Sequence, residues 1–203
     1  MKKKELEMIL QRLKSHPNPN VDLEQYQTPA NIAAEALYFA FGQGDIGGKK
    51  VVDPGCGTGI LAIGAKLLGA RDVIALDIDE SALEVAMKNA SDLAVDICLL
   101  TMDFQSFPES CDTIVMNPPF GAQKGNIHAD VPFLEQATKL ANVIYSFHKA
   151  ETQKYIEDMI QNLGWMTTHI MKFRFPIRRM YDFHRKEIEE IETIFLRTTK
   201  ITE

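Results

Sequence analysis

The stretch Val51-Val52-Asp53-Pro54-Gly55-Cys56-Gly57-Thr58-Gly59-Ile60 decides the fold of this chain of 203 residues. A short apolar run ends near a carboxylate, three glycines follow at alternate positions, and an apolar segment begins directly afterwards. Glycines allow a tight turn and close approach of the backbone to a ligand, and the first turn of a helix offers unpaired N–H groups. The stretch therefore predicts a strand, a ligand-binding turn and a helix, the unit at which open α/β sheets bind their ligands.

The rest of the chain continues this alternation of strand and helix. Strands are expected at 50–53, 72–77, 96–101, 112–116, 142–147, 165–175 and 188–198. Helices are expected at 2–14, 30–41, 58–68, 80–90, 131–141 and 151–163. The alternation predicts a seven-stranded, mostly parallel sheet with helices on both faces. The last two strands have no helix between them, so they are expected to pair antiparallel across a basic loop, 176–187.

Several residues mark the ends of these helices. Thr28 and Pro29 suit the N-cap and first turn of the helix over 30–41. Asp79 is expected to cap the helix that starts near Glu80, and Gly69 and Gly164 suit the C-caps of two others.

Composition limits the class of protein. With 22 Lys and Arg against 28 Asp and Glu, the formal net charge is −6. Three cysteines without C-x-x-C spacing and no secretory signal favour a reduced cytosolic compartment, and no run approaches the ~18 apolar residues that span a membrane. We expect a soluble, untargeted single domain, 1–203, in which 1–44 is a helical extension and 45–203 an α/β core. No His or Cys spacing indicates a metal site.

The glycine-rich turn favours one cofactor over the alternatives. A dinucleotide fingerprint needs a glycine where Ile60 stands, and no G-K-[S/T] of a P-loop follows. Asp53 repels a pyrophosphate but suits an ammonium group, which favours S-adenosylmethionine. Asp77 at the tip of the second strand suits a ribose diol. Asp103-Phe104, at the end of the third strand, can bind the amine of an adenine and pack its ring.

A second motif, Asn117-Pro118-Pro119-Phe120, follows the fourth strand. Two prolines stiffen this loop and offer no N–H. The amide oxygen of Asn117 and the carbonyl of Pro118 can each accept one hydrogen of a planar amine, which directs the nitrogen lone pair toward a methyl sulfonium. Phe120 can stack on the base. The motif predicts methylation of a planar nitrogen without a strong general base.

With these two motifs the sequence resembles the class I amino-methyltransferases. Nearly the whole chain is similar to one group of them, the methyltransferase-like protein 5 type adenine-N(6) methyltransferases of small-subunit ribosomal RNA. The similarity extends through Leu23–Tyr26, Leu76–Leu83, Met116–Gly121, Tyr145–Lys149 and Phe183–Lys186. It implies a Rossmann-like fold whose sheet has an antiparallel C-terminal strand.

The resemblance also implies roles for individual residues. In that family the positions of Gln25 and Thr28 close over the cofactor, those of Asp77, Asp103 and Phe104 hold its adenosine, and Asn117–Phe120 clamp the target adenine. The cofactor-binding set is Gln25, Thr28, Asp53, Gly55, Cys56, Gly57, Thr58, Gly59, Ile60, Asp77, Asp103 and Phe104, in which Gly55, Thr58 and Ile60 line the methionine end. Pro54 departs from the aliphatic residue usual there. Eukaryotic members are stabilised by a small zinc-ribbon activator that adds to the edge of the sheet, which implies a possible partner.

The segment 172–186 carries six Lys or Arg residues and one Asp, interleaved with aromatic residues. Basic residues neutralise phosphate and aromatic rings stack on unpaired bases, so this segment favours RNA. The expected RNA contacts are Lys124, Lys149, Arg178, Arg179, His184, Arg185 and Lys186. Two alternatives stay open: another planar nitrogen, in a release-factor glutamine or a guanine 2-amino group, and a catalytically silent RNA-binding scaffold.

Overall fold

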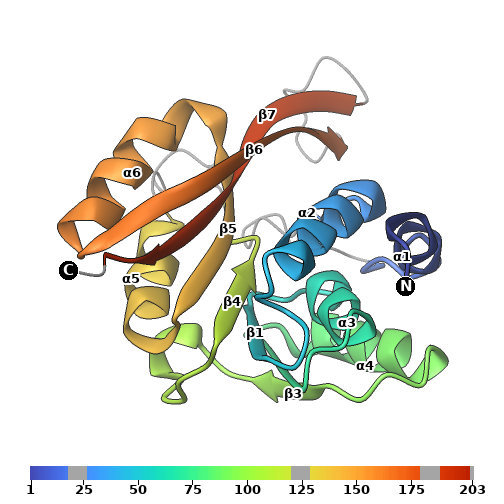
Figure 1. The fold of residues 1–203 in the computed structure, drawn as a ribbon. Coiled ribbons are helices and arrows are strands. Elements are labelled where there is room, and N and C mark those ends of the chain that lie inside the picture. Colours follow the sequence, from blue (N-terminus) through green and yellow to red (C-terminus); the bar gives the residue numbers. More distant parts are fainter. Residues whose placement is uncertain (18–26, 120–128, 179–187, 202–203) are drawn as a thin grey trace.

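The structure, a computed structural model, describes residues 1–17, 27–119, 129–178 and 188–201. Within these ranges the strands form one seven-stranded sheet in the order β3-β2-β1-β4-β5-β7-β6 (Figure 1). The strands are β1 Lys50–Pro54, β2 Asp72–Asp77, β3 Cys98–Thr101, β4 Thr113–Met116, β5 Val143–Lys149, β6 Trp165–Arg178 and β7 Ile188–Lys200. The helices are α1 Lys3–Leu10, α2 Ala30–Gly42, α3 Ile60–Leu67, α4 Glu80–Asp92, α5 Val131–Leu140 and α6 Gln153–Asn162. Short 3-10 turns cover Phe104–Ser106 and Ala150–Thr152.

The predicted α/β fold with a mostly parallel sheet is confirmed. β1 to β5 run parallel, and β7 lies antiparallel between β5 and β6. The last hairpin is longer than expected, because β6 continues to Arg178 in register with β7. The prediction that a loop begins at residue 176 is therefore wrong. The first helix is shorter than expected: it ends at Leu10, and the backbone N–H and C=O of Lys14 bond the side chain of Asn89.

The predicted helix ends are confirmed except at α2. Asp79 Oδ1 accepts the N–H groups of Ser81 and Ala82 at the start of α4. Gly69 and Gly164 follow α3 and α6 with positive φ values of 91° and 79°. Thr28 does not cap α2: the N-cap residue is Pro29, and no side chain caps that helix.

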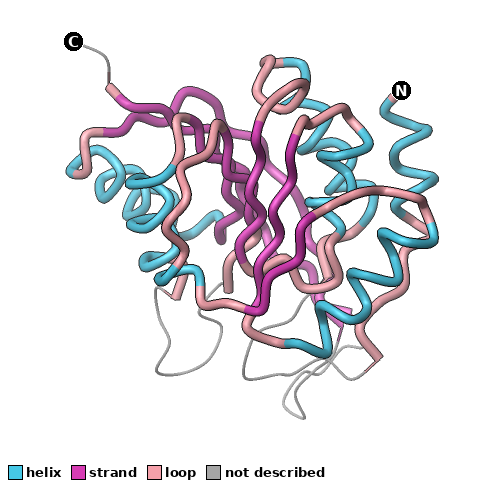
Figure 2. Tube along the Cα trace, turned by 90° about the horizontal axis from the view of Figure 1, so that it is seen from below, coloured by secondary structure: helices cyan, strands magenta, loops and turns pink. Residues whose placement is uncertain are grey.

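Alternating side chains of the strands explain why both faces of the sheet are covered. In β1, Val51 packs with the helices on one face and Val52 with those on the other. The same alternation in β2 places Val73 and Ile74 in the two separate cores. Helices α2, α3 and α4 cover one face and α5 and α6 the other, as Figure 2 shows with helices on either side of the strands.

Helix α1 adds an outer layer on α2 and α3 (Figure 1). Its two buried residues, Leu6 and Leu10, join the core of that face. The helices approach closely because α3 has a glycine at the contact: a Cβ on Gly64 would lie 2.4 Å from Leu37 Cδ1 and 3.5 Å from Leu10 Cδ1. Gly64 therefore sets the distance between α3 and the helices outside it.

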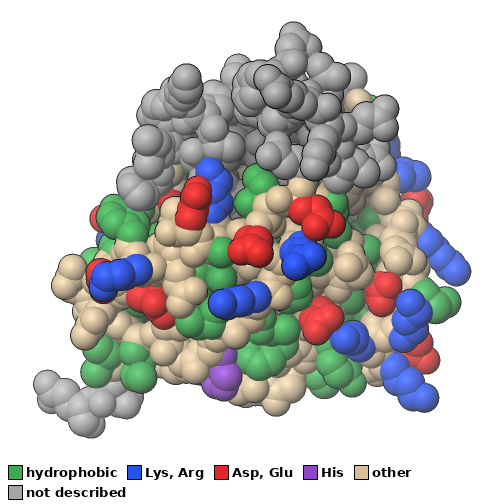
Figure 3. All heavy atoms as spheres, turned by 90° about the horizontal axis from the view of Figure 1, so that it is seen from above, with side chains coloured by type: hydrophobic (Ala, Val, Ile, Leu, Met, Phe, Trp, Pro, Cys, Tyr) green, Lys and Arg blue, Asp and Glu red, His purple; other side chains and the backbone are tan. Residues whose placement is uncertain are grey.

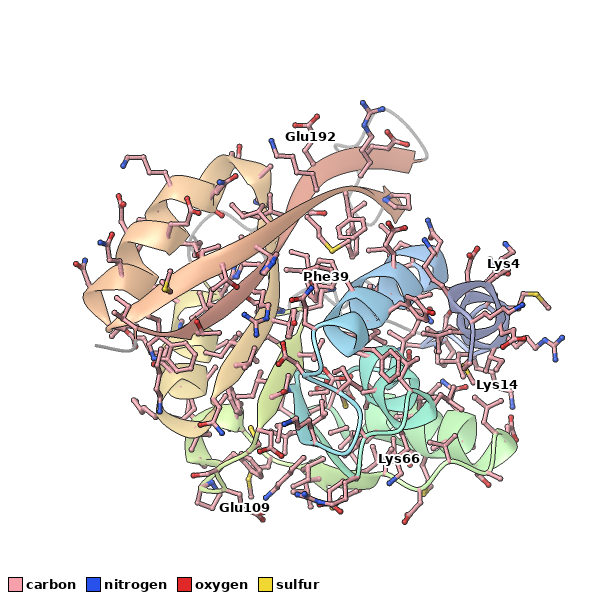
Figure 4. The ribbon with its side chains drawn as sticks, viewed as in Figure 1. Lys4, Lys14, Phe39, Lys66, Glu109 and Glu192 are labelled. Atoms are coloured by element: carbon pink, nitrogen blue, oxygen red, sulfur yellow. The ribbon has the colours of Figure 1, made fainter. Side chains whose placement is uncertain are left out.

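A buried polar cluster ties the loop before β1 to the antiparallel end of the sheet. Asp45 Oδ2 accepts the hydroxyl of Tyr145 at 2.6 Å and Nε of Arg197 at 2.8 Å. Burial raises the pKa of Tyr145, and the hydrogen bond to the carboxylate adds to this shift. Phe39 of α2 covers the same region, with its ring 6.3 Å from that of Tyr145 and 5.4 Å from that of His169 (Figure 4).

We expect Gly64→Ala to destabilise the protein by about 1–3 kcal/mol, because the new methyl group overlaps Leu37 Cδ1 and this fully buried side chain has to move within a packed core. Gly42→Ala is the matched control, since nothing lies within 4 Å of a Cβ at this helical glycine. Chemical unfolding of both variants measures the difference. Equal stability of the two would contradict the close approach.

Candidate active site

The parallel sheet brings the predicted site residues to one edge. Asp53, Asp77 and Asn117 stand at or just beyond the carboxyl ends of β1, β2 and β4. The register pairs Pro54 with Leu76 and Asp77 with Thr101, so the carboxyl ends of β1, β2 and β3 are level. These strands therefore bring their polar residues to the same edge of the sheet, the edge at which open α/β sheets bind ligands.

Backbone hydrogen bonds hold the glycine-rich loop in a conformation that its three glycines allow. Gly55, Gly57 and Gly59 all have positive φ, at 70°, 52° and 84°. The N–H groups of Gly55 and Cys56 both donate to Leu76 O, at 2.8 and 2.9 Å. Since residues with a Cβ rarely adopt positive φ, the three glycines fix the shape of the loop.

Asp77 anchors this loop through its carboxylate. Oδ2 accepts the N–H of Gly57 at 2.7 Å and Oδ1 accepts that of Asp79 at 3.0 Å. Burial raises the pKa of Asp77, and its bonds to backbone N–H groups oppose the shift. Each carboxylate oxygen can accept about two hydrogen bonds, so both retain capacity for a ribose hydroxyl. The ribose contact stays a prediction.

Asp53 lies beneath the loop with one oxygen unused. Its Oδ2 accepts the N–H of Ala62 in the first turn of α3 at 2.9 Å, while the buried Oδ1 has no partner within the described residues. Asp53 is 1% exposed, and burial raises the pKa of its carboxyl well above the ordinary value. Burial and the nearby Asp53 and Asp77 also raise the pKa of Cys56, which keeps this thiol protonated.

The end of the third strand differs from the expectation in one respect. Asp103 is exposed, and its Oδ1 accepts the N–H of Gln105 at 2.9 Å. Phe104 is 3% exposed, with its ring centroid 5.7 Å from that of Phe133. The ring of Phe104 therefore packs in the core, and of these two residues only Asp103 offers its side chain to solvent.

The catalytic loop begins with an oriented amide. Asn117 Nδ2 donates to Thr28 Oγ1 at 3.1 Å, whereas Oδ1 of Asn117 is buried and lacks a partner in the described part of the chain. Pro118 is buried and Pro119 half-buried. An amide oxygen that is buried without a donor favours a ligand that supplies one.

Not every predicted residue can be placed. Gln25, Phe120, Lys124, Arg179, His184, Arg185 and Lys186 lie outside the described residues, and so does the side chain of Arg178. Lys149 stands half-buried at the carboxyl end of β5. In the described residues, no group of three His, Cys, Asp or Glu side chains is arranged to hold a metal ion, and none of their helices is long and apolar enough to cross a membrane.

The hairpin of β6 and β7 extends past the edge of the sheet that carries the site. β5 pairs with β7 only as far as Lys149 opposite Thr193, and β6 and β7 stay paired up to Arg178 opposite Ile188. We call this extension, 173–178 with 188–193, the arm. Arg174 on the arm lies directly opposite the exposed Glu192 (Figure 4). In the described part of the ladder, a carboxylate of β7 is therefore the cross-strand neighbour of a basic residue of β6.

Comparison with known proteins identifies the family. A family model described as ribosomal protein L11 methyltransferase (PrmA) matches residues 36–118. An uncharacterized protein of Methanocaldococcus jannaschii is 39% identical over 99% of this chain and 95% of that protein. The rRNA N(6)-adenosine-methyltransferase METTL5 of Danio rerio is 35% identical over 98% of this chain and 99% of that protein. The chain belongs to the METTL5 family of methyltransferases.

The solved structures agree with this family. A crystal structure of a candidate RNA methyltransferase from Pyrococcus horikoshii is 40% identical, covers 100% of this chain and 99% of that chain, and has a TM-score of 0.92. The chain is therefore a methyltransferase with the Rossmann-like fold expected from the sequence. The residues present also fit S-adenosylmethionine, because the buried Asp53 Oδ1 has no partner among the described residues and can accept a hydrogen bond from an ammonium group.

Sequence reasoning missed three groups at this METTL5-type site. Ile78, directly after Asp77, is 58% exposed and offers an apolar surface to a flat base. Asn89 Nδ2 donates to Thr58 O and to Lys14 O, each at 3.0 Å, and so links the N-terminal segment to the glycine-rich loop. For Asn89 no local signal exists, because its partners lie 31 and 75 residues away.

The third missed group is a buried chain of hydrogen bonds behind the catalytic loop. His148 is fully buried, with Nδ1 2.6 Å from Asp130 Oδ2 and Nε2 2.8 Å from Ser146 Oγ. Ser146 pairs with Met116, the residue before Asn117, and Asp130 precedes α5. The histidine therefore braces the end of β4 against the start of α5.

We expect Asp53→Asn to stabilise the free protein and to weaken cofactor binding. Because burial raises the pKa of Asp53, its ionisation lowers the stability of the folded state as pH rises from the unfolded pKa of ~3.9 toward the higher folded pKa. Asn keeps an acceptor for Ala62 N–H and removes this cost, so the melting temperature at neutral pH rises. Calorimetry should show an affinity for S-adenosylmethionine that is roughly 10- to 100-fold weaker, since a hydrogen bond to a charged partner is lost. Unchanged affinity would mean that Asp53 does not face the ammonium group.

Proposed function

We propose that this protein transfers the methyl group of S-adenosylmethionine to N6 of an adenosine in small-subunit ribosomal RNA. Membership of the METTL5 family supports the reaction and the class of substrate. One observation in this chain carries the proposal: the buried Asn117 Oδ1, at the carboxyl end of β4, has no hydrogen-bond donor among the described residues. The exocyclic amine of an adenine supplies that donor.

The chain's own residues hold and polarise the amine. Asn117 Oδ1 accepts one amine hydrogen and the carbonyl of Pro118 accepts the other. With both hydrogens held in the plane of the ring, the nitrogen lone pair points out of that plane. S-adenosylmethionine supplies an electrophilic methyl group on its sulfonium. The N6–C bond forms as the C–S bond breaks, and the methylated nitrogen loses one proton to solvent.

The substrate adenine has to be accessible to this clamp. A base inside a duplex is not, so we propose that the target is unpaired or is flipped out at a cost of a few kcal/mol. Strand β6 supports an RNA partner, because it carries the exposed Lys172 and, on the arm, the exposed Arg174. Lys124, Lys149, Arg178, Arg179, His184, Arg185 and Lys186 stay proposed RNA contacts.

The proposal treats residues 1–203 as one methyltransferase domain in which 1–44 extends the core, 45–203. In its support, Leu6 and Leu10 of α1 share a core with Val51 of β1. Cys56, Cys98 and Cys111 are all free thiols, which is compatible with the proposed cytosolic location.

A zinc-ribbon activator is proposed as a partner at the β3 edge of the sheet. Leu99 packs toward one face of the sheet and Leu100 toward the other, and both are only partly buried on this short edge strand. A strand added beside β3 covers both leucines and pairs its free backbone groups. If a zinc-ribbon protein co-purifies with this chain, and Leu99→Asp abolishes the co-purification, the result would support this partner. If the isolated chain is as active alone as in the presence of such a protein, the result would contradict it.

Asn117→Ala should abolish methylation while it leaves the affinity for S-adenosylmethionine within a few-fold, because the amide contacts the amine and not the cofactor. Asn117→Asp is the matched control: it keeps an acceptor and should retain part of the activity. Tritiated cofactor with separate RNA, DNA and protein pools, followed by nucleoside analysis of the RNA, measures both variants. Full activity of Asn117→Ala would disprove the clamp.

The same experiment separates the alternatives. Label in N6-methyladenosine supports the proposal, and label in a guanine or in a protein glutamine identifies another planar nitrogen. A scaffold would transfer no methyl group to any pool. We expect label in adenosine, as the family predicts.

A further inference from the structure

Thr28 uses its hydroxyl in an unusual way for a residue at the start of a helix. A threonine before Pro29 and Ala30 has the sequence position of an N-cap, where its hydroxyl would accept a free N–H of α2. No side chain caps α2 in the structure. The hydroxyl instead lies 3.1 Å from Asn117 Nδ2, across 89 residues of sequence. Helix α2 therefore lacks a side-chain cap, and the Thr28 hydroxyl bonds the catalytic loop instead.

This contact matters because the two ends of an amide have opposite roles. The amine of the target base can only donate its hydrogens to the loop, so the loop must present an acceptor. A hydroxyl can bond either end of an amide, so Thr28 holds the amide in place. In the orientation observed, Nδ2 donates to Thr28 Oγ1, and Oδ1 is left buried without a partner in the described residues. If the amide were turned over, its NH2 group would face another NH2 group and the clamp would lose a hydrogen bond.

Thr28 is well placed to hold an orientation. It is 4% exposed, and the helix that follows it buries Ile32, Ala33, Ala36 and Leu37 in the core. The hydroxyl is therefore fixed to a rigid element that does not belong to the catalytic loop. Small errors in the position of a reacting group are costly: an error of about 1 Å can reduce a rate roughly 100-fold.

We propose that Thr28 is a positioning residue for methyl transfer, which acts through Asn117 by holding its amide with Oδ1 toward the target amine. This inference rests on the proposed function. It differs from the expectation that Thr28 serves the cofactor, because the group that Thr28 contacts belongs to the catalytic loop. A positioning role affects the rate at saturation, whereas a cofactor contact affects the affinity for the cofactor.

The test compares Thr28→Val, which keeps the shape and removes the hydroxyl, with Thr28→Ser, which keeps the hydroxyl. We expect Thr28→Val to lower kcat roughly tenfold to a hundredfold at saturating RNA and cofactor. Its dissociation constant for S-adenosylmethionine, measured by calorimetry, should stay within about threefold of that of the parent protein. Thr28→Ser should restore most of kcat. The residual activity of Asn117→Asp should be less sensitive to Thr28→Val than the parent activity, because contacting residues are energetically coupled.

Three results would overturn the inference. An unchanged kcat in Thr28→Val would show that Asn117 needs no support. A loss confined to cofactor affinity, with kcat intact at saturation, would assign Thr28 to the cofactor. A lowered melting temperature in Thr28→Val that Ser does not restore, together with proportionate loss of kcat, would assign it a structural role.

Failure of the proposed function has a different signature. In that case the parent protein itself would not label adenosine in RNA. The same variants are then assayed on whichever planar amine or amide the parent labels, because Asn117 must present an acceptor to each of them. A parent that labels no pool would overturn both the function and the positioning role.

Discussion

β1 pairs with β2 along one side and with β4 along the other, so the order of the strands reverses around it. Loops that leave neighbouring strands on either side of such a reversal diverge toward opposite faces and leave an opening between them. The glycine-rich loop after β1 and the Asn117 loop after β4 are the two loops at this point. Neighbouring strands hold residues of both segments: Asp77 of β2 accepts the N–H of Gly57 in the first, and His148 of β5 bonds Asp130, where the second reaches α5.

The site also contains two buried hydrogen-bond acceptors to which no described residue donates. In the described residues, the buried side-chain oxygens without a donor are Asp53 Oδ1, Asn117 Oδ1 and Thr167 Oγ1. An orphaned buried acceptor costs about 1–3 kcal/mol, so folding alone does not favour two of them at one edge of the sheet. The two in the site differ in charge, and this difference matches their ligands. A carboxylate suits the ammonium of a cofactor, and a neutral amide suits the weakly polar amine of a base.

The sequence predicted whatever depends on local chemistry. The glycine spacing predicted a tight turn, and Gly55, Gly57 and Gly59 form it with positive φ. The alternation of strands and helices predicted a sheet covered on both faces, which the two cores confirm. Prediction failed where a hydrogen-bonding group could bond either a local or a distant partner. Thr28 suited a cap by every local rule and bonds Asn117 instead, and the Lys14 backbone bonds Asn89 instead of continuing α1. Partners far apart in the sequence leave no periodic or motif signal, so only the structure reveals these contacts.

The charge of the arm also depends on residues that are far apart in the sequence. Along the sequence, 172–186 is strongly basic and 189–192 is acidic, which suggests two separate surfaces. Because β6 and β7 are antiparallel, the described part of the ladder places Arg174 opposite Glu192. Cross-strand neighbours of opposite charge attract, and a basic residue partly neutralised in this way attracts phosphate less. Arg174 therefore has a neighbour of opposite charge on its own sheet, and in the proposed mechanism the uncharged clamp, not long-range attraction, orients the target base.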